Sequence, residues 1–281
     1  MVIQMNIKKA FFEGWYFKHQ SDNSTIAFIP GRAESGAFVQ VISDKESRQF
    51  PVKEFSADCN VIRAGECIFS SQGCWIDLPG ISGDIRYGRL TPLCSDIMGP
   101  FRFLPLECSH GVISMSHKLT GAIVMDGEYL CFDNGRGYIE RDRGTSFPTS
   151  YLWLQCNAFS QPGSIMVSIA EIPFAGIHFT GCICAIVFEK KEYRIATYCG
   201  VKIHAYSPQH VCLSQKNLLL DIEINTSEKG HPLASPVDGK MSGIIRESHQ
   251  AAIRCRLWNV GQLVMDLKSN HASFEFVANQ E

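Results

Sequence analysis

The stretch Leu220-Asp221-Ile222-Glu223-Ile224 decides the fold class of this chain, because apolar and charged residues alternate in it without a break. A period of two places the apolar side chains on one face of a β-strand and the charged ones on the other. The same alternation recurs at Ile253, Cys255 and Leu257, which are interleaved with Arg254 and Arg256, and at Phe274-Glu275-Phe276. These segments predict half-buried antiparallel strands.

Turn signals separate such segments along the whole chain, whereas helical periodicity is scarce. The signals are Pro30-Gly31, Ser71-Gln72-Gly73, Asp126-Gly127, Asn134-Gly135, Pro162-Gly163 and Asp238-Gly239. Many short strands separated by turns at regular intervals are typical of a sandwich or barrel rather than of an alternating βαβ fold. We therefore predict an all-β protein.

Two short echoes suggest that the chain consists of two halves. Gly14-Trp15-Tyr16-Phe17-Lys18 has a counterpart in Tyr151-Leu152-Trp153-Leu154-Gln155, and Ser82-Gly83-Asp84-Ile85-Arg86 resembles Ser242-Gly243-Ile244-Ile245-Arg246. A half of roughly 140 residues suits a closed or nearly closed eight-stranded antiparallel barrel, which can enclose one small ligand. We place the boundary in the 144–150 stretch and predict halves at 1–146 and 147–281.

Composition excludes several function classes. The net charge of −2 gives no reason to expect nucleic acid as a partner, and no stretch approaches 18 apolar residues, so neither secretion nor membrane spanning is indicated. Residence in the cytoplasm is the default expectation. The twelve cysteines have no C-x-x-C spacing, which favours reduced, mostly buried thiols.

Nucleotide, metal and hydrolase motifs are missing from the sequence. It contains no P-loop, G-x-G-x-x-G, H-E-x-x-H or G-x-S-x-G, and His231, His249 and His271 have no metal-ligand spacing. We therefore expect neither a metal site nor a cofactor.

Two segments carry candidate acid–base groups. Glu107 and His110 lie three residues apart within Gly99–Met115, an apolar segment that contains two prolines. In the strand-like segment Gly137–Gly144, Tyr138, Glu140 and Asp142 share one face. Both sets have a plain structural interpretation, as a satisfied polar network or a solvent-facing charge run. If they face a dry cavity instead, burial and like-charge crowding raise the pKa of a carboxyl there.

Aromatic residues supply candidate walls for an apolar ligand. One group lies in the Phe11–Phe17 strand, where Glu13 adds a carboxylate, and others lie near the acid–base candidates. The candidate substrate-binding residues are Glu13, Trp15, Phe17, Phe101, Phe103 and Trp153. Aromatic ring faces stabilise a nearby cation. The alternative is structural: a barrel strand whose Trp15 fills one end of the barrel would have the same sequence.

Four blocks of this sequence resemble the tocopherol cyclase family, and together they cover almost the full length. The blocks are Phe12–Lys18, Gly99–Met115, Gly137–Pro148 with Tyr151–Gln155, and His231–Ser248, which contains Pro236-Val237-Asp238-Gly239-Lys240-Met241. The resemblance extends distantly to carotenoid 1,2-hydratases and implies two lipocalin-like barrels in tandem, with a shared or adjacent apolar cavity. The hydratases use a His followed by a Tyr-x-Asp pair. Here His110 precedes Tyr138 by 28 positions, Glu140 replaces the Asp, and Val112 stands where the hydratases have Trp.

The resemblance implies an enzyme that needs no cofactor and protonates a prenyl double bond, after which a phenol oxygen or water attacks. We assign the acid to Glu140 or Glu107, assisted by Asp142, with His110 as the base for the phenol and Tyr138 orienting the acid. Trp15, Phe17 and Trp153 would shield the cation. The expected partner is an apolar prenylated small molecule, loaded through peripheral contact with a membrane; the oligomeric state stays open. The alternatives are a non-catalytic lipocalin-like carrier of a lipophilic molecule and a regulatory or assembly module.

Overall fold

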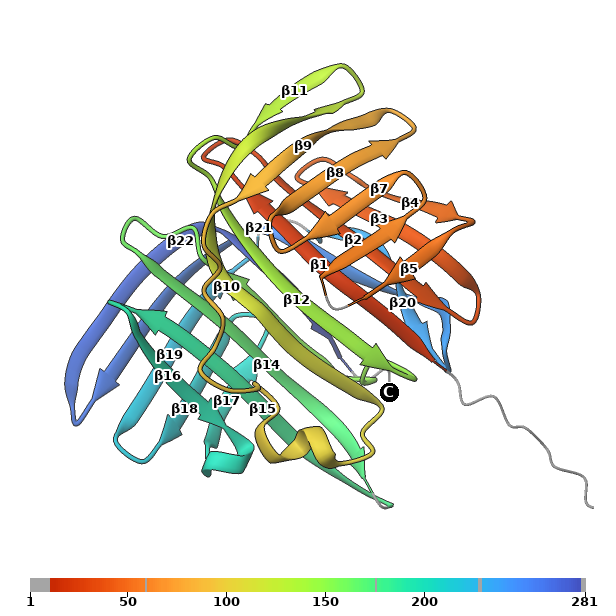
Figure 1. Cartoon of the computed structure of the whole chain (residues 1–281). Helices are drawn as coiled ribbons and strands as arrows, with labels where there is room; N and C mark the ends of the chain where they lie inside the picture. The colour runs from red at the N-terminus through yellow and green to blue at the C-terminus, as the bar shows by residue number, and fades with distance from the viewer. Residues whose placement is uncertain (1–10, 59, 175, 227–228, 279–281) are drawn as a thin grey trace, which may run out of the picture.

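The computed structural model describes residues 11–58, 60–174, 176–226 and 229–278, and almost all of its regular structure is strand (Figure 1). Two antiparallel sheets account for these strands. The first sheet contains β1 (Phe12–Gln20), β2 (Thr25–Ala33), β3 (Gly36–Ser43), β4 (Ser47–Val52), β5 (Phe55–Ala57), β6 (Val61–Ala64), β7 (Cys67–Ser70), β8 (Gly73–Leu78), β9 (Ile81–Tyr87), β10 (Cys108–Met125), β11 (Glu128–Cys131) and β12 (Arg136–Gly144). A short 3-10 helix, η1 (Gly99–Phe103), precedes β10.

The second sheet is formed by the C-terminal part of the chain. It contains β13 (Tyr151–Cys156), β14 (Gly163–Phe174), β15 (Ile177–Phe188), β16 (Lys191–Ala196), β17 (Lys202–Ser207), β18 (His210–Gln215), β19 (Leu218–Asn225), β20 (His231–Val237), β21 (Lys240–Asn259) and β22 (Gln262–Val277). A 3-10 turn, η2 (Thr197–Cys199), follows β16. The all-β prediction is confirmed, and the alternating segment that decided it is β19.

The two sheets share one strand order. The first runs β4-β3-β2-β1-β12-β10-β9-β8-β7-β6-β5 and the second β16-β15-β14-β13-β22-β21-β19-β18-β17, so β1, β12 and β10 correspond to β13, β22 and β21. Of the closed or nearly closed barrels that we predicted, the closed form is ruled out, because among the described residues the end strands β4 and β5, and likewise β16 and β17, do not pair. Each sheet curls around its own core without closing, as β6 contacting β2 and β3 shows for the first.

Two predicted turns are confirmed in the geometry that their residues favour. Asp126 and Gly127 connect β10 to β11, and Asp238 and Gly239 connect β20 to β21, in both cases as two-residue hairpin loops. All four residues have positive φ, from 47° to 86°. Asp-Gly supplies that conformation at low cost, and it matches the twist of the flanking strands.

The buried apolar residues form three clusters. One fills the concave side of the first sheet and another that of the second. The third lies between the sheets and joins side chains of both, for example Tyr16 and Ile42 from the first with Trp153 and Met166 from the second. A row of polar contacts also crosses there, including Lys18 Nζ donating to Gln155 Oε1 at 3.0 Å. The sheets therefore pack face to face over a mixed core.

The sheets separate in sequence between Gly144, the end of β12, and Tyr151, the start of β13. Halves that fold independently at 1–146 and 147–281 stay a prediction. All cysteines in the described ranges are free thiols, as expected. No described helix is long and apolar enough to cross a membrane. Peripheral membrane contact and cytoplasmic residence remain predictions.

Candidate active site

A cavity of about 170 Å³ lies between the two sheets. Cavities of similar volume take a single aromatic ring, so a ligand with a long tail would extend through the mouth. The first sheet lines it with Gly14, Tyr16, His110, Glu140 and Asp142, among others. The second sheet and η1 contribute mostly apolar side chains, including Met98, Phe101, Tyr151, Trp153, Ala170, Ile172, Phe179, Leu233 and Ile245, together with two carboxyls, Glu247 and Glu275.

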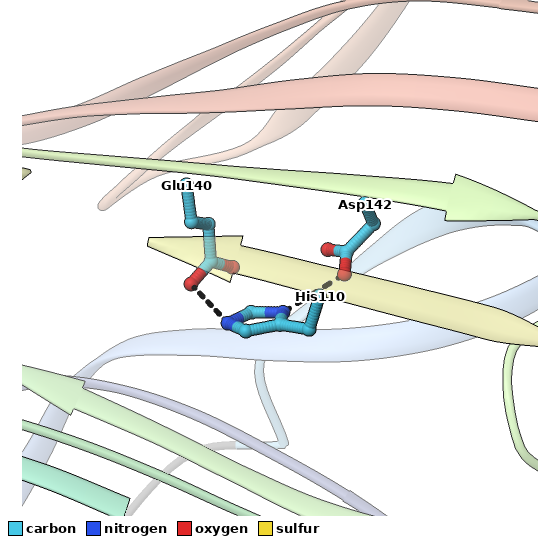
Figure 2. A group of neighbouring side chains, drawn as sticks. All are labelled: His110, Glu140 and Asp142. Carbon is cyan, nitrogen blue, oxygen red and sulfur yellow. Dashed lines mark hydrogen bonds and ion pairs between the residues drawn. The ribbon is translucent and has the colours of Figure 1, made fainter. Parts of the chain in front are cut away.

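Strand alternation and register bring the acid–base candidates together. On β12, Glu140 and Asp142 project from the same face, and Asp142 pairs with His110 of β10. The imidazole lies between the two carboxyls (Figure 2): Nδ1 is 2.8 Å from Asp142 Oδ1, and Nε2 is 3.3 Å from Glu140 Oε2. The contact with Asp142 is a hydrogen bond. The contact with Glu140 is an ion pair that does not meet the geometry of a hydrogen bond. Tyr138 donates to Glu140 Oε2 at 2.5 Å.

The electrostatics of this cluster follow from burial and charge. Burial lowers the pKa of His110, but Asp142 and Glu140 outweigh it, so the pKa of His110 is raised well above its usual value. The two carboxyls, Asp142 above all, therefore favour the protonated ring. Burial raises the pKa of Glu140, and the charge of His110 partly offsets that shift. A buried acid beside a fixed cation can release its proton into an apolar cavity and leave a compensated ion pair.

The same three residues bring their ligand atoms within 4.8 Å of one another. In a metal site these atoms would converge on one point. Here each nitrogen of His110 faces a different carboxyl, as an imidazolium between two acids does. The arrangement fits a proton network better than a metal centre.

The second sheet contributes a polar row at the corresponding strands. Trp153 of β13 pairs with Glu275 of β22, which pairs with Glu247 of β21. Glu275 accepts a hydrogen bond from Tyr151 Oη at 2.6 Å. Burial raises the pKa of Glu275 well above its usual value, and the charge of Glu247 adds to the shift.

Glu247 connects this row to the first sheet. It is fully buried, and its Oε1 accepts hydrogen bonds from Tyr16 Oη and from His249 Nε2, the latter at 2.8 Å. Tyr16 lies beside Trp153, with ring centroids 5.5 Å apart in an edge-on arrangement. Residues of the two sheets therefore surround one cavity from both sides.

The structure separates several predicted site residues from this cavity. Glu107 is exposed and does not border it, so solvent leaves that carboxyl without the dry surroundings that an acid catalyst needs. Phe103 is 76% exposed and also lies outside the lining, whereas Phe101 borders the cavity. Both ring nitrogens of His110 face a carboxyl, and this pairing favours the protonated ring over a free base for a phenol. These three assignments are corrected.

Strand alternation explains the remaining corrections, which fall on β1. Tyr16 faces the cavity, so Phe17 points the other way and packs within the core of the first sheet. Glu13 is paired with Arg32 and Arg141 and borders a separate, more polar cavity. Trp15 borders both cavities, but its ring belongs to the first-sheet core beneath Arg141. Trp153 lines the main cavity.

Sequence reasoning overlooked Tyr16, Tyr151, Glu247 and Glu275. Glu275 sits in Phe274-Glu275-Phe276, and Glu247 lies inside a strand of alternating character, so both look like solvent-facing charges. The only signal was the echo between the halves. The first echo, between Gly14–Lys18 and Tyr151–Gln155, covers Tyr16 and Tyr151, whereas neither echo includes Glu247 or Glu275.

Comparisons with known proteins agree with this architecture. The profile of the family described as "Tocopherol cyclase-like" matches residues 84–277. A probable chloroplastic tocopherol cyclase of Oryza sativa subsp. japonica is 28% identical over 205 residues, covering 67% of this chain and 44% of the relative. The chloroplastic tocopherol cyclase of Zea mays is 26% identical over 209 residues, covering 69% and 43%. The chain spans less than half the length of these plant relatives.

Solved structures show the same fold at 11% sequence identity. CghA with Sch210972 superposes with a TM-score of 0.65, covering 97% of this chain and 90% of the other. Kievitone hydratase from Nectria haematococca gives 0.52 and covers 96% and 89%. A protein described as a putative AttH from Nitrosomonas europaea gives 0.53 and covers 95% and 93%.

Proposed function

The chain belongs to the tocopherol cyclase-like family, and from that premise we propose that it catalyses a proton-initiated cyclisation, or a related isomerisation or hydration, of a prenylated, terpenoid-like substrate. The observation that carries the proposal is the cluster of Glu140, His110 and Asp142 in the wall of an otherwise largely apolar cavity. Apolar walls hold a prenyl tail, and the cluster supplies a proton from Glu140, which is buried.

In the first step, Glu140 is the acid. Its carboxyl proton passes to the less substituted carbon of the double bond, whose π electrons form the new C–H bond and leave a tertiary cation. Glu140 becomes a carboxylate that faces the imidazolium of His110 across 3.3 Å. Asp142, hydrogen-bonded to the other ring nitrogen, keeps His110 charged. The ion pair therefore stabilises the charge that the transfer creates on the enzyme.

In the second step, an oxygen of the substrate attacks the cation and closes the ring. The proton on that oxygen is released to the Glu140 carboxylate, which restores the starting state, so no net proton is consumed. If water attacks instead, the product is an alcohol and the same residue is restored. Tyr138 donates to Glu140 and fixes its orientation in both steps.

The test is incubation of the protein with a prenylated hydroquinone, followed by liquid chromatography and mass spectrometry. Cyclisation changes retention without changing mass, hydration adds one water, and a carrier returns the ligand unaltered. Glu140→Gln and His110→Gln should abolish turnover, since acid–base groups commonly contribute 10²–10⁴-fold.

Matched controls are Glu66→Gln and His204→Gln, because both residues are exposed and lie outside the cavity lining. Unaltered ligand recovered from the wild-type protein would favour the lipocalin-like carrier. Full activity in both the Glu140 and the His110 variants, with folding confirmed by circular dichroism, would reject the assigned roles.

A further inference from the structure

The cavity wall opposite His110 carries a polar row that the proposed reaction leaves without a role. Trp153, Glu275 and Glu247 occupy paired positions on β13, β22 and β21, so they form one line across the second sheet. All three line the cavity. The proton donor Glu140 lies on the first sheet, and a substrate spanning the cavity would contact both walls.

Two atoms in this row have no hydrogen-bond partner among the described residues. They are the indole Nε1 of Trp153, whose residue is 6% exposed, and Oε2 of Glu247, whose residue is fully buried. An unpaired donor or acceptor in a buried place is unfavourable, because it has lost its hydrogen bonds to water without gaining a partner. A ligand hydroxyl group could pair with both, because its oxygen accepts a hydrogen bond and its hydrogen is donated.

Glu275 lies between them and adds a second donor. Burial and the charge of Glu247 raise the pKa of Glu275 well above the usual value, which favours its protonated form. Tyr151 donates to Oε2, its one hydrogen-bond partner in the described chain, which leaves the other oxygen free. A neutral carboxylic acid both donates and accepts, as a hydroxyl group does.

The charges around the cavity restrict the head group further. The lining includes four acidic residues, Glu140, Asp142, Glu247 and Glu275, and neither Lys nor Arg is among the described lining residues. The cation of His110 is already held between two carboxyls. A diphosphate or carboxylate head group would be desolvated here without a cation to pair with, which is strongly unfavourable.

We propose that Trp153, Glu275 and Glu247 form a specificity subsite for an uncharged, hydroxyl-bearing head group, and that this subsite excludes anionic lipids such as prenyl diphosphates and fatty acids. The inference rests on the proposed function only in that the same substrate places its tail at Glu140. A carrier would use the subsite in the same way.

The test measures equilibrium binding by calorimetry in the Glu140→Gln background, where the reaction is blocked. The three probes are a prenylated hydroquinone, its di-O-methyl ether and a prenyl diphosphate. Trp153→Phe keeps a ring against Tyr16 but removes the N–H, so affinity for the hydroquinone should fall about 3- to 10-fold. Affinity for the ether, which cannot donate to Glu247, should be weaker from the start and less sensitive to the substitution. The diphosphate should bind at least 100-fold more weakly than the hydroquinone.

Substitution of Glu275 distinguishes a neutral acid from a carboxylate. Glu275→Gln retains one donor and one acceptor and should keep hydroquinone affinity within about 3-fold, whereas Glu275→Leu should lose about 10-fold or more. Trp75→Phe is the matched control, because Trp75 is 53% exposed and lies outside the cavity lining.

Equal weakening of hydroquinone and ether by Trp153→Phe would overturn the subsite, because it would reduce Trp153 to an apolar wall. Diphosphate binding as tight as hydroquinone binding would overturn it as well. The outcome is separable from that of the proposed function: wild-type protein that discriminates between the probes without converting any of them keeps the subsite and loses the catalysis. Turnover without discrimination does the reverse.

Discussion

Tyr16→Phe tests whether the hydrogen bond between the two sheets stabilises the fold. Tyr16 Oη, on β1, donates to Glu247 Oε1, on β21, and both residues are buried. The substitution removes only the hydroxyl and leaves the ring that packs edge-on against Trp153. Glu247 would retain His249 as its hydrogen-bond partner, while its other oxygen already has none among the described residues.

The expected loss is about 1–3 kcal/mol of unfolding free energy, because a buried acceptor loses one of its two donors. At roughly 2–4 °C per kcal/mol for a chain somewhat smaller than this one, the melting temperature should fall by about 2–12 °C. Urea unfolding followed by tryptophan fluorescence gives the free energy, and calorimetry gives the melting temperature.

Tyr129→Phe is the matched control, since Tyr129 is 69% exposed and should change stability by less than about 0.5 kcal/mol. If Tyr16→Phe proves as stable as the wild type while Trp153 keeps its environment, the contact between the sheets contributes nothing to stability. The argument that Glu247 depends on Tyr16 would then be refuted.

Three further predictions concern the charged groups. Asp142→Asn removes the negative charge that raises the pKa of His110 most, so that pKa should fall, as imidazole ¹⁵N chemical shifts during a pH titration would show. An unchanged titration would contradict the assignment. Glu275 has a folded pKa above its unfolded value of about 4.3, so the stability that it contributes is present below that pH and is lost as the pH rises through the folded pKa. Glu275→Gln should therefore gain melting temperature relative to wild type as the pH is raised, and a constant difference would argue against a protonated Glu275. Glu13→Gln should lower the unfolding free energy, measured in urea, by about 1 kcal/mol, because Arg32 and Arg141 lose a buried partner but remain partly exposed to water. An effect near zero would show that the pairs are only surface contacts.

The sequence was sufficient for the fold class because period-two alternation and Asp-Gly turns are local signals. β19 and the two hairpins at Asp126-Gly127 and Asp238-Gly239 show this directly. The sequence left open whether each barrel closes, because closure depends on whether the two end strands of each sheet meet. That is a property of accumulated twist and curl, and no single segment encodes it.

For the candidate site, alternation correctly grouped Tyr138, Glu140 and Asp142 on one face, but it could not say which face meets the cavity. The same ambiguity misassigned β1, where Phe17 was predicted to line the cavity but packs in the first-sheet core, and Tyr16 lines the cavity instead. Successive side chains of a strand point to opposite faces, so an error of one residue exchanges a cavity-lining residue for a core residue. Spatial partners far apart in sequence, such as Tyr16 and Glu247, lie beyond any local pattern.

The matching strand order of the two sheets offers a physical reason for the division of labour in the cavity. β12 and β10 present Glu140, Asp142 and His110, while the equivalent strands β22 and β21 present Glu275 and Glu247. In the first set, the pKa of His110 is raised, so its ring can stabilise the carboxylate that Glu140 becomes on losing its proton, whereas no described cation contributes to the pKa of Glu275. One architecture therefore places a proton-releasing acid on one wall and a proton-retaining acid on the other. The side that holds His110 is the side on which a double bond can be protonated.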